Sequence, residues 1–182
     1  MRPRRKPSTE GAVTAPAKSA SSRARAAPSQ DEAVQAFLWN IVSIGNYFEE
    51  ISFVWAQMLG VNVHQWMILM AVKDLDRGGG ISVKGVSMKL HADASFVTSQ
   101  SKSLEKLGFM RRMTSSEDAR VVLMSLTDKA YKEIANLQKM QEPLKDSIFS
   151  ELDEKALNSI NEKLSVLCER FQRTAKRLAA EL

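Results

Sequence analysis

The stretch ASFVTSQSKSLEKLGFMRRMTSSEDARVVLMSLT, residues 94–127, decides the fold. Its first part predicts a helix over about 94–107, and Gly108 suits the helix end. Two short apolar runs follow, 109–113 and 121–126, and the residues between them are polar or small. This pattern predicts a β-hairpin directly after the helix.

The segment before this stretch completes a helix-turn-helix. Residues 83–90 predict a short helix, and residues 91–93 predict a tight turn that leads into the helix at 94. Further upstream, Asn62 suits the cap of a helix over 63–75, and the glycine-rich residues 76–80 predict a loop.

Long apolar helices are predicted on both sides of this segment. Residues 31–59 carry apolar side chains at helical spacing and contain no proline. Thr127 suits the cap of a helix to about Met140 or beyond, with Pro143 as a kink or a break. Ser150 and Asp153 come close to a capping box for a last helix. That helix repeats apolar residues at steps of three and four, namely Leu157, Ile160, Leu164, Leu167, Phe171, Ala175, Leu178 and Leu182.

The fold class predicted from these elements is mostly α with a small β-hairpin wing. The chain has 182 residues, 44% of them hydrophobic and 26% charged, which is typical of a soluble globular protein. It contains no run of 18 apolar residues, so we expect no transmembrane helix and no membrane partner. The long terminal helices are too apolar to remain uncovered, so they need a partner surface.

Residues 1–30 differ in composition from the rest of the chain. They hold seven basic residues, one acidic residue and four of the five prolines. We expect a disordered basic tail, because such a segment buries too little apolar surface to offset its ordering entropy. A tail of this kind can add nonspecific phosphate contacts, and an organelle transit peptide is the alternative interpretation.

The second helix of the helix-turn-helix and the hairpin carry the candidate binding residues. Hydroxyl and amide side chains suit base edges, a lysine can reach a phosphate, and an arginine on a narrow wing can enter the minor groove. An aspartate close to that arginine can hold it by paired hydrogen bonds. The helix alone is equally well explained as an ordinary solvated face. The candidate DNA-binding residues are Ser95, Thr98, Ser99, Gln100, Lys102, Arg111, Arg112, Asp118 and Arg120.

Two motifs in this region resemble the MarR family of bacterial transcriptional regulators. The passage LEKLGFMRR, residues 104–112, resembles the family's "LE-x-x-G" passage, in which two hydrophobic residues and an arginine follow the glycine. Asp118-Ala119-Arg120, followed by Leu126-Thr127, resembles the family's "D-x-R…L-T" wing signature. Ala119 stands where a second arginine is common, and Ala130 where a glycine often follows. The resemblance covers about residues 35–180.

The resemblance implies a winged-helix repressor that acts as a homodimer in the bacterial cytoplasm, associated with the nucleoid. The MarR-like domain would span 31–182, with the winged helix at about 62–126 and dimerisation helices at about 31–59 and 127–182. Two recognition helices would then enter successive major grooves of a palindromic, double-stranded operator.

The resemblance also implies release from DNA by a small effector. Aromatic carboxylates, phenols and CoA thioesters are common inducers in this family. Apolar aromatic side chains with a few polar groups could form such a pocket, although packing in the core explains each of them as well. The candidate residues are Trp39, Asn46, Tyr47, Trp55, His64, Trp66 and Met70. With two histidines and one cysteine in the chain, we expect no metal site and no cofactor.

Two alternatives remain open at the level of sequence. A redox-sensing regulator could use Cys168. A helical dimerisation protein without DNA binding is the second alternative. The sequence lacks phosphate-loop, dinucleotide, hydrolase and zinc-protease motifs, so we do not expect an enzyme.

Overall fold

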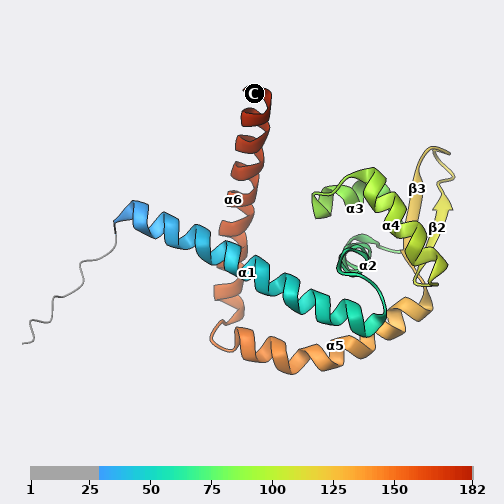
Figure 1. The fold of residues 1–182 in the computed structure, drawn as a ribbon, viewed down its shortest axis with the longest axis horizontal. Coiled ribbons are helices and arrows are strands. Elements are labelled where there is room, and N and C mark those ends of the chain that lie inside the picture. The colour runs from blue at the N-terminus through green and yellow to red at the C-terminus, as the bar shows by residue number, and fades with distance from the viewer. Residues whose placement is uncertain (1–28, 182) are drawn as a thin grey trace, which may run out of the picture. The chain divides into compact units, whose positions relative to one another are not determined.

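The computed structural model describes residues 29–181, and Figure 1 shows the order of its elements. The chain divides into two compact units, residues 1–43 and 44–182, and helix α1 (Gln30–Leu59) runs across the division. The expected basic tail lies outside the described residues, apart from its last two positions. Within residues 29–181, none of the helices has the length and hydropathy that a membrane span requires.

The described part of the first unit is the start of α1. A capping box closes this end: the Ser29 backbone N–H donates to Glu32 Oε2 at 2.8 Å, and the Glu32 N–H donates to Ser29 Oγ at 3.2 Å. The helix therefore begins at Gln30, one residue before the expected start. Apart from the half-buried Leu38, the side chains of residues 29–43 are exposed.

The second unit contains the helix-turn-helix and the sheet. Helices α2 and α3 have the predicted bounds, and the recognition helix α4 ends one residue early, at Lys106. The elements are α2 (Val63–Leu75), β1 (Ile81–Ser82), α3 (Val83–Leu90), α4 (Ala94–Lys106), β2 (Met110–Thr114), β3 (Val122–Leu126), α5 (Asp128–Phe149) and α6 (Glu154–Glu181). Asn62 caps α2 as predicted, within a capping box that Gln65 completes.

The sheet has three antiparallel strands in the order β1-β3-β2. The predicted hairpin is present: Met110 pairs with Leu126, and Thr114 pairs with Val122. The sequence missed β1, in which Ile81 pairs with Met124. A two-residue strand is too short to show alternation of apolar and polar residues. The fold class, mostly helical with a small β wing, is confirmed.

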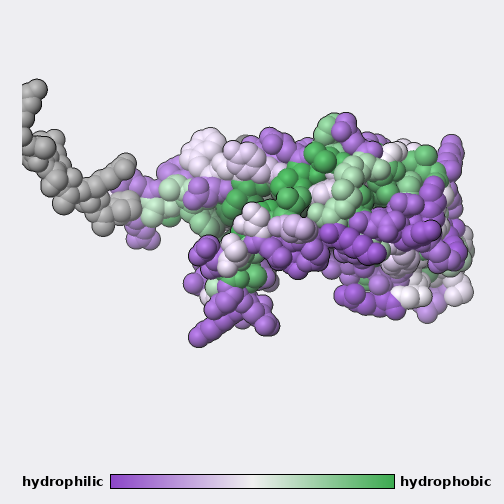
Figure 2. Space-filling model, turned by 90° about the horizontal axis from the view of Figure 1, so that it is seen from below, coloured by the Kyte–Doolittle hydropathy of each residue, from purple (hydrophilic) through white to green (hydrophobic). Residues whose placement is uncertain are grey.

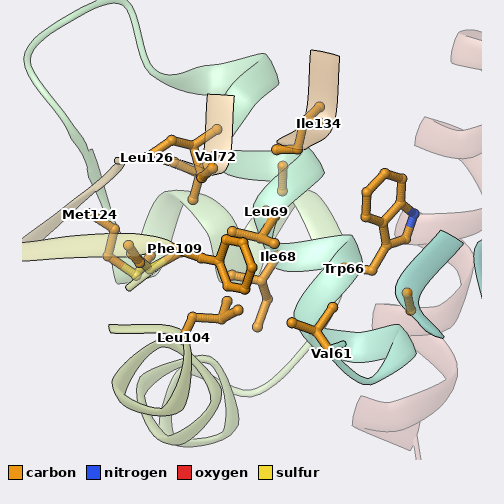
Figure 3. Close-up of a cluster of buried hydrophobic side chains, with 14 of the residues drawn as sticks. Val61, Trp66, Ile68, Leu69, Val72, Leu104, Phe109, Met124, Leu126 and Ile134 are labelled. Atoms are coloured by element: carbon orange, nitrogen blue, oxygen red, sulfur yellow. The ribbon is translucent and has the colours of Figure 1, made fainter. Parts of the chain in front are cut away.

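The core of the second unit fixes α4 against the sheet. Figure 3 shows Ile68 and Leu69 of α2 together with Leu104 of α4 and Met124 of β3, and all four are almost completely buried. Ile134 of α5 is also fully buried in this cluster. Because burial of one large aliphatic side chain contributes about 1.5–3 kcal/mol, these contacts hold the recognition helix in a defined position.

The last two helices differ from the sequence-based expectations in two details. Of the two alternatives at Pro143, a kink or a break, the break is absent, because α5 continues through this residue. The predicted capping box of Ser150 and Asp153 is also wrong, because Ser150 closes α5. Asp153 is itself the cap of α6: its Oδ1 accepts from the Ala156 N–H at 2.7 Å, and its carbonyl accepts from the Leu157 N–H.

Candidate nucleic-acid interface

The recognition helix α4 has one buried and one exposed side. Val97, Ser101 and Leu104 are fully buried and form the inward stripe, as the helical period requires. The exposed residues on the opposite side are short hydroxyls and lysines, and the smaller side chains leave room for a close approach to a flat partner. These exposed residues are Ser95, Ser99, Lys102 and Lys106. Thr98 lies half-buried at the edge of this surface.

Gln100 lies on the flank of α4 that faces α2. Its Oε1 accepts a hydrogen bond from Asn62 Nδ2 at 3.4 Å, and the neighbouring Ser103 Oγ accepts from Gln65 Nε2 at 3.1 Å. Gln65 is almost fully buried and also belongs to the capping box of α2. These two bonds tie the flank of α4 to the start of α2, so the Gln100 amide has a partner within the protein.

Phe96 is an exposed aromatic residue of α4 that the sequence analysis did not single out. Its ring packs edge-on against His64, with the ring centroids 5.3 Å apart, and 37% of the residue is exposed. On a helix that enters the major groove of DNA, an apolar ring can contact a thymine methyl group. The sequence did contain a signal for this residue, because Phe96 is a large apolar residue in the first turn of the helix and lies off its inward stripe.

The wing presents an arginine that is held by a carboxylate. Arg120 Nε and Nη2 donate to Asp118 Oδ1 and Oδ2 at 3.1 and 3.2 Å, and the Arg120 backbone N–H donates to Oδ1 at 2.9 Å. These hydrogen bonds from Arg120 hold the pKa of the Asp118 carboxyl below its usual value. The Arg120 side chain is nevertheless 91% exposed. The predicted pairing is confirmed, and it presents an oriented cation to solvent.

The two arginines of β2 have different surroundings. Consecutive side chains of a strand point to opposite faces of the sheet. Arg111 is exposed, and its Nη2 lies 3.9 Å from Asp128 Oδ2 at the start of α5. Arg112 is half-buried, and its Nε is buried without a hydrogen-bond partner among residues 29–181. Arg111 and Arg112 therefore do not form one cationic patch.

Comparison with known proteins agrees with this geometry. The sequence profile of the MarR family matches residues 61–122, which span the helix-turn-helix and most of the wing. The HTH-type transcriptional regulator SarZ of Staphylococcus haemolyticus (strain JCSC1435) is 25% identical over 112 residues, which cover 60% of this chain and 71% of SarZ. Residues 61–122 of this chain thus match the winged-helix region of the MarR family.

Solved structures share the fold of this chain. A MarR/EmrR family regulator from Acinetobacter sp. ADP1 superposes with a TM-score of 0.63 at 18% identity, over 76% of this chain and 96% of the other. A point mutant of S. aureus MepR, bound to an oligodeoxyribonucleotide, has a TM-score of 0.50 at 14% identity, over 75% of this chain and 97% of the other. Sequence identities of 18% and 14% establish a shared fold and nothing further.

The candidate effector residues are not gathered around one cavity. Trp55 and Trp66 are buried in the hydrophobic core, with Met70 half-buried against it. Trp39 and Tyr47 are exposed on α1, and Trp39 belongs to the first unit. The sequence pattern selected aromatic residues, and in this chain two of them pack in the core while Trp39 and Tyr47 lie exposed on a helix.

Two cavities of the second unit contain one candidate each. The larger, of about 620 Å³, is open and contains Asn46; its walls are otherwise apolar or acidic. Its lining residues are Asn46, Glu49, Glu50, Phe53, Val54 and Val63. The smaller, of about 150 Å³, is lined by His64 together with apolar residues that include Met67, Leu90 and Phe96. Sequence reasoning missed Glu49 and Glu50, since a surface glutamate gives no signal of a cavity.

Across the described part of the chain, no three His, Cys, Asp or Glu side chains come together as a metal-binding group. Cys168 is a free, exposed cysteine on α6.

Proposed function

We propose that this protein is a homodimeric, ligand-responsive repressor that binds palindromic operator DNA in the bacterial cytoplasm. The observation that carries the proposal is the exposed hydroxyl and lysine side of α4, which lies in one lobe with the wing and its oriented Arg120. The MepR mutant of the same fold was solved with an oligodeoxyribonucleotide, which supports DNA as the partner.

The proposed DNA contacts are divided between α4 and the wing. Ser95, Ser99 and Thr98 would contact base edges in the major groove, while Lys102 would contact a phosphate. Arg120 would enter the adjacent minor groove, where the negative potential is strongest. Arg111, which is exposed at the base of the wing, would bind a phosphate, and Arg112 would support the strand from its half-buried position.

The proposed dimer rests on apolar surface that the single chain leaves open. No residue of α6 is buried, although its apolar residues repeat on one side of the helix. Ile160, Phe171 and Leu178 are all exposed, as are Ile44 and Phe48 of α1. Figure 2 shows exposed hydrophobic surface among hydrophilic residues on one face of the molecule. Exposed apolar surface of this extent marks a protein interface.

The proposed division of the chain follows from these two surfaces. Residues 62–126 form the winged-helix part, and residues 31–59 and 127–182 form the dimerisation helices. The basic segment 1–30 would add phosphate contacts that do not depend on DNA sequence.

A titration of DNA binding tests the proposed function. Fluorescence anisotropy with labelled DNA from upstream of the protein's own gene, repeated at several salt concentrations, should give saturable binding. The logarithm of the binding constant should fall linearly with the logarithm of the salt concentration. A scrambled duplex of equal length is the control. Equal affinity for both duplexes, or no binding, would contradict the proposal and favour a helical dimerisation protein.

The proposed effector is a small aromatic molecule that shifts the dimer away from its DNA-competent state. Such a ligand acts only through its difference in affinity for the two states. The open cavity beside Asn46 offers apolar walls from Phe53, Val54 and Val63, and its acidic residues are Glu49 and Glu50. Two carboxylates repel an anion. Within the predicted class, the cavity therefore favours a neutral phenol over an aromatic carboxylate or a CoA thioester.

A thermal-shift screen tests this effector. Matched pairs of a phenol and the corresponding benzoate, added to the protein, should raise the melting temperature more for the phenol, and the phenol should then release labelled DNA. If peroxide alone releases the DNA, and Cys168→Ser abolishes that release, the redox alternative replaces the small ligand.

A further inference from the structure

The turn between the recognition helix and the wing is attached to the start of α5. Thr127 Oγ1 donates to the Gly108 carbonyl at 2.7 Å, and the Thr127 backbone N–H donates to the Phe109 carbonyl at 3.2 Å. The same hydroxyl accepts from the Ala130 N–H at 3.2 Å and so caps α5. One side chain therefore joins the end of α4 to the beginning of α5.

Lys129 adds a second attachment at the same place. Its Nζ donates to the Leu107 carbonyl at 2.9 Å and lies 4.3 Å from the centroid of the Phe109 ring. Its stem covers Gly108, because a Cβ built on that glycine would meet Lys129 Cδ at 3.9 Å. The ammonium thus lies at the negative end of the α4 dipole and over the face of an aromatic ring, and both positions favour a cation.

The turn itself has little freedom to adopt another shape. Gly108 has a φ of +76°, in the left-handed region that disfavours other residues. Its N–H donates to the Glu105 carbonyl, and the Phe109 N–H donates to the Leu104 carbonyl. Phe109 and Leu104 are buried in the core. A movement of the first turn of α5 would therefore be transmitted to the end of α4 through Thr127 and Lys129.

We propose that Lys129 is a positioning residue, which sets the orientation of the recognition helix relative to α5 and so controls operator affinity without contacting DNA. The proposal rests on the DNA-binding function proposed above. In this role Lys129 differs from Lys102 and Arg111, which are proposed to bind phosphates.

The salt dependence of operator binding separates positioning from phosphate contact. Lys129→Met keeps the stem and removes the charge, and it should weaken operator binding about three- to tenfold, given the modest strength of such contacts. The slope of affinity against salt should stay unchanged, whereas a lost phosphate contact lowers it by about 0.9. Lys129→Arg, which can donate to the same carbonyl, should restore most of the affinity. Lys132→Met, an exposed lysine on the same helix, is the charge-matched control.

Hydrogen exchange of the free protein tests the attachment without DNA. The amides of Leu107, Gly108 and Phe109 should exchange faster in Lys129→Met than in the wild type and in Lys132→Met, with melting temperatures close to one another. Unchanged exchange at these amides, or a reduced salt slope in Lys129→Met, overturns the positioning role. If the wild type binds no operator, the proposed function fails, while the exchange measurement still decides whether Lys129 holds the turn.

Discussion

The winged-helix part of the chain and its C-terminal helix satisfy their apolar residues in different ways. Leu104 and Met124 are completely buried by other parts of the same chain, whereas Phe171 and Leu178 of α6 are more than half exposed. The first region needs no second chain to cover its core, because every side chain of that core belongs to the same chain. The second depends on a surface from outside the chain, and a second copy supplies it in the proposed dimer.

Removal of residues 157–182 should have the largest effect. In the proposed dimer, this deletion would expose the apolar side of α1, including Ile44 and Phe48. We expect aggregation or unfolding rather than a stable monomer. Size-exclusion chromatography with light scattering measures the outcome. A folded, monomeric truncation that still binds operator DNA would place the interface elsewhere.

A pair of substitutions compares the two regions directly. Leu104→Ala should lower the free energy of unfolding by about 2–5 kcal/mol, because it leaves a cavity in a closed core. Phe171→Ala should instead lower the free energy of unfolding by an amount that grows as the protein is diluted, since it weakens association of the two chains. Denaturant unfolding at several protein concentrations checks both. A concentration-independent effect of Phe171→Ala would count against the dimer seam.

Arg120→Ala should weaken DNA binding and leave stability unchanged. The Arg120 side chain is 91% exposed, so its loss removes no packing. We expect operator affinity to fall by about 1–3 kcal/mol, the scale of one good charged contact. Arg173→Ala, on α6 and also exposed, is the matched control. Anisotropy titrations and melting curves of the three proteins test this expectation, and wild-type affinity in Arg120→Ala would exclude the wing contact.

Gln100 and Ser99 are neighbours on α4, and their substitutions should affect DNA recognition in different ways. Sequence reasoning predicted that Gln100 contacts bases, but its amide oxygen accepts from Asn62, whereas Ser99 is exposed. Ser99→Ala should change the preferred base at one position of each half-site. Gln100→Ala should weaken binding to all sites slightly and keep the same motif. Binding-site selection with each variant compares them, and a changed motif for Gln100→Ala would restore its predicted role.

The smallest effect concerns the pH dependence of the wing. Because Arg120 lowers the pKa of the Asp118 carboxyl in the folded state, the pair stabilises the wing above the ordinary carboxyl pKa. This contribution is lost as the pH falls through the lowered pKa. The small difference in melting temperature between wild type and Asp118→Asn should therefore be present at neutral pH and disappear in acid. A difference that increases with acidity would contradict this pairing.

Much of the fold could be predicted from local signals along the chain. Asn62 and Thr127 are side-chain caps, and Gly108 has the positive φ that a helix end requires, so each marked a boundary correctly. Errors arose where the local signal was ambiguous or too short. Ser150 and Asp153 have the spacing of a capping box, yet Asp153 alone caps α6. Strand β1 depends on its pairing with β3 and has no pattern of its own.

The candidate site was predictable only where its partners are close in sequence. Asp118 and Arg120 are two residues apart, and their pairing follows from the wing itself. The bond between Asn62 and Gln100 spans 38 positions, and it exists only because the core packs α2 across α4. The attachment of Lys129 to Leu107 likewise depends on how the sheet returns the chain to the end of α4.

Hydroxyl-radical footprinting on an operator fragment tests the proposed dimeric DNA binding most directly. A two-fold dimer with one recognition helix per chain should protect two half-sites about 10 base pairs apart, with the wing of each chain protecting the adjacent minor groove. Arg120→Ala should lose the minor-groove protection and keep the major-groove contacts. A single protected half-site at saturating protein, or uniform protection along the fragment, would contradict a dimer that recognises DNA through α4 and the wing.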